Sequence, residues 1–364
     1  MSFSRRGFLT TATTVASGFG LGLNSNLGSM VNTTNPTRLT RDDILKERTR
    51  ESMLAVQRGM EWIKKGRNKR SGGYGVDKGH KDDIGCTAVV GLAMLGDGST
   101  PSQGPNKQAL RDIVNFLLKR IRVMPATNIT SEKGTQLQRK IGDQAHTFFA
   151  LLFLTQVAGE AHIPKETLTA ARKVIDAVAK AQRPDGSWGN ESWAPTLGTV
   201  MGWTSLRSSH FAGFEVGASP EKTSDYLIGK MKKEMGQSRG HWMHQLYKNA
   251  AGIRVLYAMG KEDDAIVKKS FKEVLKLVKD GSTAFNQAGG EEYLAFHLIT
   301  ETMLQKAGED WSKWFPVVRD KIIKVQNQDG SWVGHHCITS RTFCTAAACL
   351  VLSAPNRYLP ISQQ

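Results

Sequence analysis

The chain has 364 residues, of which 40% are apolar, and a formal net charge of +16. This composition is typical of a globular protein, and it excludes an intrinsically disordered chain. The basic residues are spread over helical stretches without a nucleic-acid-binding motif. The charge therefore predicts a basic, solvated surface or an anionic partner in the cell envelope, and no nucleic-acid partner.

The N-terminus has the pattern of an export signal. Residues 4–9 read Ser-Arg-Arg-Gly-Phe-Leu, which resembles a bacterial twin-arginine signal. The apolar run that follows is too short and too polar to anchor the chain, and no later segment is apolar enough to span a membrane. We therefore predict a signal peptide over 1–32, a linker over 33–40 and one domain over 41–364. The implied location is periplasmic or extracellular, and the protein is not an integral membrane protein.

Two kinds of helix alternate from residue 42 onward. Amphipathic stretches predict outer helices, and stretches that are apolar nearly all round predict buried inner helices. Helices joined by short loops pack antiparallel, so each outer helix and its inner mate form a hairpin. The expected pairs are 42–66 with 83–95, 107–123 with 143–157, 165–182 with 205–216, 221–235 with 244–259, 263–278 with 292–306, and 311–326 with 341–352.

These pairs predict an all-α fold, an α/α toroid of six helical hairpins with six outer and six inner helices. An open array of repeats needs a polar cap on its last helix. The last expected inner helix is as apolar as the others, so we expect the sixth hairpin to close onto the first.

One turn sequence, Gln-x-x-Asp-Gly-Ser-Trp, occurs twice, at 182–188 and 326–332. Its glycines supply the positive φ that ends a helix and reverses the chain. Its glutamine can bond to exposed backbone at a helix end, and its tryptophan can shield that bond. The predicted structural residues are Gln182, Gly186, Trp188, Gln326, Gly330 and Trp332.

The repeated turn resembles the QW motif of the squalene cyclase and protein prenyltransferase β-subunit repeat superfamily. The resemblance covers about residues 41–360, by pattern more than by identity, and implies a toroid with a central cavity for an apolar or isoprenoid-like ligand. The Asp-x-Asp-Asp motif of the cyclases is absent, and 81–84 (Lys-Asp-Asp-Ile) departs from it at the first position. The family's activities therefore do not transfer by residue, and whether the protein is an enzyme stays open.

Polar residues recur at the expected starts of the inner helices. A spacing of three places two side chains on one helix face, so these residues would form a collar at one end of the ring. The collar residues are Asp83, Cys86, Asp143, His146, Arg207, His210, His244, Tyr247, Glu292, Arg341 and Cys344.

Three interpretations of the collar stay open. Its residues can simply satisfy buried helix ends and one another. Asp83, Cys86, His146 and His336 can hold a metal, with zinc possible, because protein prenyltransferases hold zinc at this end of the toroid with Asp, Cys and His. Without a metal, the collar is an acid–base or ligand-binding site. The catalytic candidates are then Asp83, Asp143 and Glu292, and the ligand-binding candidates are Cys86, His146, Arg207, His210, His244, Tyr247, Arg341 and Cys344.

Three functions follow. The first is binding of an apolar or isoprenoid-like molecule in the central cavity. The second is a toroid enzyme of the glycosidase or polysaccharide lyase type that acts on an anionic envelope polymer, with Arg207, Arg341 and His210 holding an acidic sugar. The third is a noncatalytic envelope scaffold. Aromatic residues that can line the cavity are Phe148, Phe149, Trp203, Phe211, Phe214, Tyr293, Phe296 and Phe343. A disulfide from Cys86 to Cys337 or Cys344 is a separate possibility.

Overall fold

The computed structural model describes residues 41–125, 134–188, 192–217, 220–235, 242–279 and 284–363. The expected signal peptide and linker lie outside these residues. The outer helices are α3 (Arg50–Lys65), α5 (Lys107–Val123), α8 (Pro164–Lys180), α10 (Pro220–Met235), α12 (Ala265–Leu275) and α14 (Gly308–Lys324). The inner helices are α4 (Ile84–Gly96), α7 (Ala145–Val157), α9 (Pro195–Phe211), α11 (Trp242–Ala258), α13 (Gly290–Lys306) and α15 (Arg341–Ser353). Short elements complete the chain: α2 (Arg41–Leu45), α6 (Gln136–Ile141), η1 (Ala158–Glu160), η2 (Lys276–Val278), η3 (Ala354–Asn356) and η4 (Pro360–Gln363).

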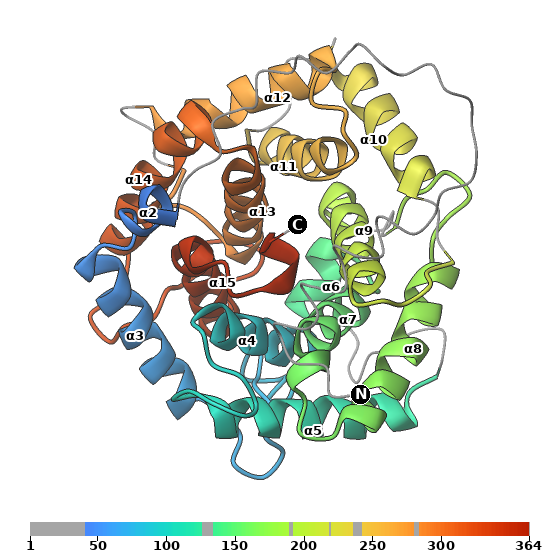
Figure 1. Ribbon diagram of the computed structural model, residues 1–364, viewed down its shortest axis with the longest axis vertical. Coiled ribbons are helices and arrows are strands. Elements are labelled where there is room, and N and C mark those ends of the chain that lie inside the picture. Colours follow the sequence, from blue (N-terminus) through green and yellow to red (C-terminus); the bar gives the residue numbers. More distant parts are fainter. Residues whose placement is uncertain are drawn as a thin grey trace.

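The twelve long helices form two concentric rings, as Figure 1 shows down the ring axis. The described residues form no strand. Each inner helix packs against the next, and α15 packs against α4, which closes the inner ring. In the outer ring, α14 packs against α3 at the same junction. The predicted all-α toroid of six hairpins, closed between the sixth and the first, is confirmed.

The two rings differ in burial as their sequences predict. Every residue of α4 and of α7 is buried, whereas α3 buries only one stripe, which includes Ala55, Met60 and Ile63. A helix that is apolar all round has no face for solvent, so it is stable only inside a ring of other helices. The apolar core therefore lies in the inner ring and in the layer between the rings.

The repeated turn connects the outer and inner helices of one hairpin, and its hydrogen bonds reach the next hairpin. Gly186 and Gly330 have φ of 87° and 91°. The Gln182 amide donates to Thr223 Oγ1 of α10 over 3.1 Å, and the Gln326 amide donates to the Ala55 carbonyl of α3 over 2.9 Å. Each glutamine thus bonds its own turn to the next outer helix, and Gln326 does so across the closing junction.

The tryptophans of these turns point inward. Trp188 Nε1 donates to the Val178 carbonyl over 2.9 Å, and Trp332 Nε1 donates to the Ile322 carbonyl over 2.8 Å. The backbone of each tryptophan also exchanges hydrogen bonds with a threonine of the following inner helix, Thr199 or Thr345. These bonds fix the inner helix to the turn, which is the structural role expected of the motif.

Two helices begin well away from their predicted starts. The first outer helix is predicted over 42–66, but α3 begins at Arg50, after the separate short helix α2. The third inner helix was expected over 205–216, but α9 runs from Pro195 to Phe211. Its first half contains Gly198 and Gly202, where a Cβ atom would lie 2.3 Å from the Ile141 carbonyl oxygen and 2.7 Å from the Trp188 ring. The glycines weaken the local helix signal, and they are needed because two neighbours approach the helix so closely.

The C-terminal tail, residues 354–363, turns back across the end of the inner ring. Asn356 Nδ2 donates to the Gly96 carbonyl over 3.1 Å, and the Ile361 amide donates to Gln156 Oε1 over 3.0 Å. Between these bonds Arg357 adopts a left-handed conformation with φ of 51°. The tail therefore has a fixed path, and it carries Leu359 and Ile361 into the inner ring, both buried.

Two further findings concern the whole described chain. Among the described residues, no helix is both long and apolar enough to cross a membrane. All four cysteines are free thiols, so neither disulfide considered for Cys86 is formed.

Candidate functional site

The inner ring has two different ends. Each hairpin returns the chain to the same side, so the inner helices run parallel and all begin at one end of the ring. We call that end the N-terminal mouth and the opposite end the C-terminal mouth. Helix N-termini concentrate backbone N–H donors, and helix C-termini concentrate carbonyls. The two mouths therefore offer different chemistry.

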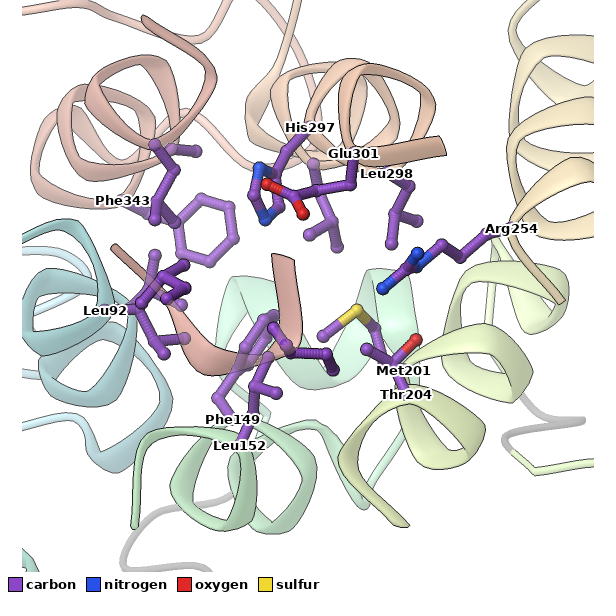
Figure 2. Close-up of a pocket in the computed structure, with 16 residues that line it drawn as sticks. Leu92, Phe149, Leu152, Met201, Thr204, Arg254, His297, Leu298, Glu301 and Phe343 are labelled. Atoms are coloured by element: carbon purple, nitrogen blue, oxygen red, sulfur yellow. The ribbon is translucent and has the colours of Figure 1, made fainter. Parts of the chain in front are cut away.

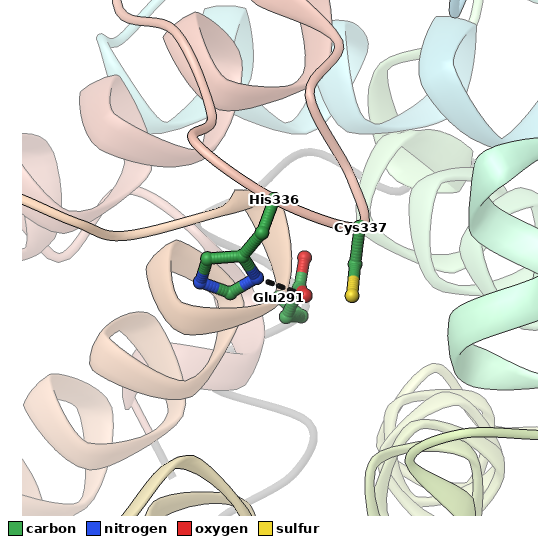
Figure 3. Close-up of side chains that lie close together, drawn as sticks. All are labelled: Glu291, His336 and Cys337. Atoms are coloured by element: carbon green, nitrogen blue, oxygen red, sulfur yellow. Dashed lines mark ion pairs between the residues drawn. The ribbon is translucent and has the colours of Figure 1, made fainter.

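Two adjacent glutamates lie buried at the N-terminal mouth, at the start of α13. His336 Nδ1 lies 3.2 Å from Glu291 Oε1 (Figure 3). His336 Nε2 lies 3.3 Å from Glu292 Oε2. Gly289 allows this approach, because a Cβ atom there would lie 2.6 Å from the His336 carbonyl oxygen. One imidazole ring thus faces both carboxylates.

Other groups surround these glutamates. Lys140 at the end of α6 places its Nζ 3.3 Å from Glu291 Oε1 and 3.6 Å from Cys337 Sγ. The Tyr247 hydroxyl of α11 donates to Glu292 Oε1, and the Lys140 ammonium lies 4.9 Å from the centre of the Tyr247 ring. The Gly289 amide donates to Glu292 over 2.6 Å, and the Ile338 amide donates to Glu291 over 3.1 Å. We call Lys140, Tyr247, Glu291, Glu292, His336 and Cys337 the mouth cluster.

The mouth cluster shifts the proton equilibria of its members. Burial, and then the neighbouring Glu291 carboxylate, raise the pKa of Glu292 from 4.5 to about 7. Burial and the two glutamates also raise the pKa of the Tyr247 phenol, so it remains a hydrogen-bond donor. Burial and Glu291 raise the pKa of the Cys337 thiol. Glu292 therefore exchanges a proton near neutral pH, which is the range that a general acid or base needs.

The metal-binding interpretation can be tested on the donor atoms. Among the described residues, one set of carboxylate, imidazole and thiol groups comes close enough to share an ion: Glu291, His336 and Cys337, whose ligand atoms lie within 4.8 Å of one another. The Lys140 ammonium already lies among these donors. A zinc ion beside it would meet a like charge, so the set does not fit a metal while Lys140 is in place.

The four residues expected to ligate a metal do not come together. Asp83 and His146 form a fully buried pair, with Asp83 Oδ2 2.8 Å from His146 Nε2. Asp83 Oδ1 also accepts a hydrogen bond from the Cys86 amide over 2.6 Å, which caps α4. The Cys86 thiol donates to the Gly75 carbonyl, and His336 belongs to the mouth cluster. Asp83 and Cys86 thus take part in holding the start of an inner helix.

The other collar candidates are scattered. Asp143, His244 and Arg341 are exposed, and the Arg341 guanidinium pairs with Asp329 of the repeated turn over 2.6 Å. The Cys344 thiol is buried against the Ile338 carbonyl. Arg207 and His210 lie near the end of α9, at the C-terminal mouth, because that helix begins ten residues earlier than expected. Of the collar, Tyr247 and Glu292 meet in one cluster with His336, and Asp83 pairs with His146. Arg207 and His210 line a separate pocket of about 260 Å³, together with Trp203 and Phe211, two of the aromatics expected to line a cavity.

A small cavity of about 30 Å³, the axial cavity, lies between the inner helices (Figure 2). Its walls are mainly apolar and include Phe149 and Phe343, two of the aromatics expected there. Leu359 and Ile361 of the C-terminal tail also line it. The tail thus fills space inside the ring that the inner helices alone would leave open.

Three ionisable side chains interrupt the apolar wall: Arg254 of α11 and His297 and Glu301 of α13. In Figure 2 all three reach toward the cavity. Arg254 Nη1 donates to Gln305 over 2.9 Å. Within the described residues, Arg254 Nε, Glu301 Oε2 and His297 Nδ1 have no hydrogen-bond partner. Burial lowers the pKa of Arg254 and of His297, so the His297 imidazole is neutral at pH 7.

Reasoning from the sequence missed most of these residues. Lys140 lies on α6, a short helix inside the second hairpin, between α5 and α7, that the pattern did not predict. Glu291 precedes the position taken as the start of its helix. His297 and Glu301 are four apart on one face of an otherwise apolar helix, and that spacing was the available signal.

Comparison with known proteins gives the following. No known family matches the sequence, and no curated protein does. Among solved structures, a variant of the type II terpene cyclase MstE from Scytonema, in complex with its substrate geranylgeranyl dihydroxybenzoate, is similar with a TM-score of 0.49. The two chains are 14% identical, and the match covers 85% of this chain and 98% of the cyclase.

Proposed function

We propose that the protein binds an apolar, isoprenoid-like molecule in the axial cavity. The observation that carries the proposal is that Leu359 and Ile361 of the C-terminal tail already occupy this space. A cavity of about 30 Å³ holds little more than water, so the ligand enters only when the tail leaves. The tail then acts as an internal substitute for the ligand and keeps the apolar wall out of water.

The energetic balance favours such an exchange. Each large aliphatic side chain contributes about 2 kcal/mol when it is buried, and a larger apolar ligand offers more area to the same wall. The Ile361 amide bond to Gln156 holds the tail next to the cavity, and the Asn356 bond to Gly96 holds its start at the end of α4. Ligand binding therefore replaces the buried side chains of the tail by the apolar part of the ligand, with a small change in free energy.

The test is to loosen the tail and measure apolar binding. The Leu359→Ser/Ile361→Ser variant should bind a fluorescent apolar probe about tenfold or more tightly than the parental chain, because the probe no longer competes with two buried side chains. A Val123→Ser/Leu168→Ser variant, which changes two exposed side chains, is the matched control. Native mass spectrometry of both variants after export detects any co-purified lipid. If neither the parental chain nor the loosened variant binds the probe, the proposal is overturned and the scaffold interpretation remains.

A second candidate function is acid–base catalysis on an anionic envelope polymer at the N-terminal mouth. It is favoured by the pKa of Glu292, about 7, beside the Tyr247 hydroxyl and the His336 imidazole. Glu292→Gln should abolish any hydrolase or lyase activity on acidic polysaccharides, and the parental pH–rate profile should show a pKa near 7. Exposed His244→Gln is the control at the same mouth. Activity that survives Glu292→Gln would remove this candidate.

We also propose that the chain is exported by the twin-arginine route, on the strength of residues 4–9. Replacement of Arg5 and Arg6 by lysine should retain the protein in the cytoplasm of a bacterial host, as measured by fractionation. Export of the variant at the parental level would contradict the assignment.

A further inference from the structure

The axial cavity holds polar groups whose partners the fold does not supply. Arg254 and Glu301 are buried, with 2% and 3% of their surface exposed, and His297 is partly buried. Each keeps one nitrogen or oxygen without a hydrogen bond within the described part of the chain. A buried polar atom left unpaired is costly, so native proteins rarely keep several at one place without a purpose. We call Arg254, His297 and Glu301 the cavity triad.

The charges of the cavity triad restrict what can complete it. The Glu301 carboxylate favours the charged form of the Arg254 guanidinium, which burial opposes, so the two charges support each other. An anion brought into the cavity would meet Glu301, and a cation would meet Arg254. In an apolar enclosure either repulsion is strong. The group that completes the triad is therefore uncharged.

The unpaired atoms also define a hydrogen-bonding pattern. Arg254 Nε carries an N–H and can only donate, whereas a carboxylate oxygen such as Glu301 Oε2 accepts. A hydroxyl group does both, because it accepts from the guanidinium and donates to the carboxylate. A neutral His297 imidazole nearby can serve either role, depending on its tautomer. An ether or a ketone satisfies Arg254 alone, and a hydrocarbon satisfies neither charge.

We infer that the axial cavity takes an apolar alcohol: a molecule whose hydrocarbon part fills the space of Leu359 and Ile361 and whose single hydroxyl lies between Arg254 and Glu301. This inference rests on the proposed function and specifies its ligand class. The remaining cavity wall is aliphatic and aromatic apart from Thr204, whose hydroxyl also has no hydrogen-bond partner within the described residues. Beyond the triad, the cavity therefore offers a second polar group this one neutral hydroxyl. Selectivity then comes from the cost of leaving the two charges unpaired, which penalises ligands without a hydroxyl.

The experiment compares four probes with the same carbon chain on the full-length protein: dodecan-1-ol, methyl dodecyl ether, dodecane and dodecanoate. Binding is followed by calorimetry, in the parental chain and in the loosened Leu359→Ser/Ile361→Ser variant. Dodecan-1-ol should bind about tenfold to a hundredfold more tightly than the ether. The alcohol makes a hydrogen bond to the charged carboxylate that the ether cannot make, and the free energy of such a bond corresponds to this ratio of affinities. Dodecanoate should bind less tightly than the alcohol.

An Arg254→Met/Glu301→Leu variant removes both charges together and replaces them with apolar side chains of similar size, a change that buried ion pairs tolerate well. It should bind dodecane as well as or better than the parental chain and should lose the preference for the alcohol. The matched control is Lys313→Met/Glu309→Leu, which removes an exposed ion pair of α14 with the same change of charge. This control should keep the preference.

The outcomes separate the two claims. Equal affinity for all four probes overturns the alcohol assignment and leaves apolar binding intact. Tightest binding of dodecanoate overturns it in favour of an anionic ligand. An alcohol preference that survives in the Arg254→Met/Glu301→Leu variant shows that the triad is not its source. Failure of every probe in the loosened variant overturns the proposed function itself.

Discussion

The two mouths of the ring both contain ionisable side chains with buried atoms that lack a hydrogen bond, but among the described residues only the N-terminal mouth brings such atoms within ion-pair distance of one another. At the N-terminal mouth, Glu291 and Glu292 face Lys140, His336 and Tyr247, and backbone amides donate to both carboxylates. Near the C-terminal mouth, the cavity triad keeps unpaired atoms beneath an apolar tail. In the mouth cluster, Glu291 Oε1 and both ring nitrogens of His336 also lack a hydrogen bond, but each lies 3.2–3.3 Å from another ionisable group. The unpaired atoms of the cavity triad have no such neighbour among the described residues, and we propose that a ligand supplies it.

The largest test of this difference removes one charge from each region. Glu301→Leu leaves the Arg254 guanidinium buried without a counter-charge, and it should lower the free energy of unfolding by about 3–5 kcal/mol. Lys140→Met should cost about 1–2 kcal/mol, because Glu291 keeps His336 and a backbone amide as partners. Urea denaturation of the two variants measures both values.

The control for this test is Arg254→Met added to Glu301→Leu, which should recover most of the lost stability because no buried charge remains. Equal losses in Glu301→Leu and Lys140→Met would mean that the cavity triad has partners as good as those of the mouth cluster. That result would contradict the proposal that a ligand completes the cavity triad.

The next effect is a pH dependence specific to the N-terminal mouth. The pKa of Glu292 is raised in the folded protein, from 4.5 to about 7, so the folded state binds more protons than the unfolded state between these values. Its contribution to stability is present below pH 4.5 and is lost as the pH rises through 7. The loss amounts to as much as about 3 kcal/mol. Glu292→Gln should flatten this part of the stability curve, measured by denaturation from pH 4.5 to 8.

Glu301→Gln serves as the comparison at the other region and should leave that slope in place. A parental slope that persists in Glu292→Gln would assign the titration to another group of the cluster. Stability that rises with pH over this window would contradict the raised pKa outright.

The fold was predictable because the spacing of apolar residues in the sequence shows which helix faces are buried. Alternation of amphipathic and apolar helices is local information, and the two Gln-x-x-Asp-Gly-Ser-Trp turns add positions where an outer helix ends and the chain reverses into its inner mate. Helix α9 shows the limit of that information. Gly198 and Gly202 are poor helix formers whose place in a helix is decided by Ile141 and Trp188, neighbours that only the folded ring brings close.

The site was less predictable for a related reason. Alignment of helix starts placed Tyr247 and Glu292 at the correct mouth, since helix starts are set by local pattern. It could not show that Lys140, from a short helix inside the second hairpin, reaches Glu291. The cavity triad was hidden differently: its residues lie in the middle of buried helices, where a charged side chain has meaning only once its distance from the axis is known.

The smallest expected effect concerns metal binding at the N-terminal mouth. Lys140 holds its ammonium 3.3 Å from Glu291 and 3.6 Å from the Cys337 thiol, so a zinc ion must displace it to reach the donors. Lys140→Met should therefore raise zinc affinity by about tenfold or more, measured by competition with a chelating dye. Cys337→Ser in the same background should cancel the gain, because thiolate is the strongest of the three donors. If the parental protein binds zinc as tightly as Lys140→Met, the Lys140 ammonium moves away from the donors at no cost. The mouth cluster would then bind an external ion, as the cavity triad is proposed to bind an external ligand.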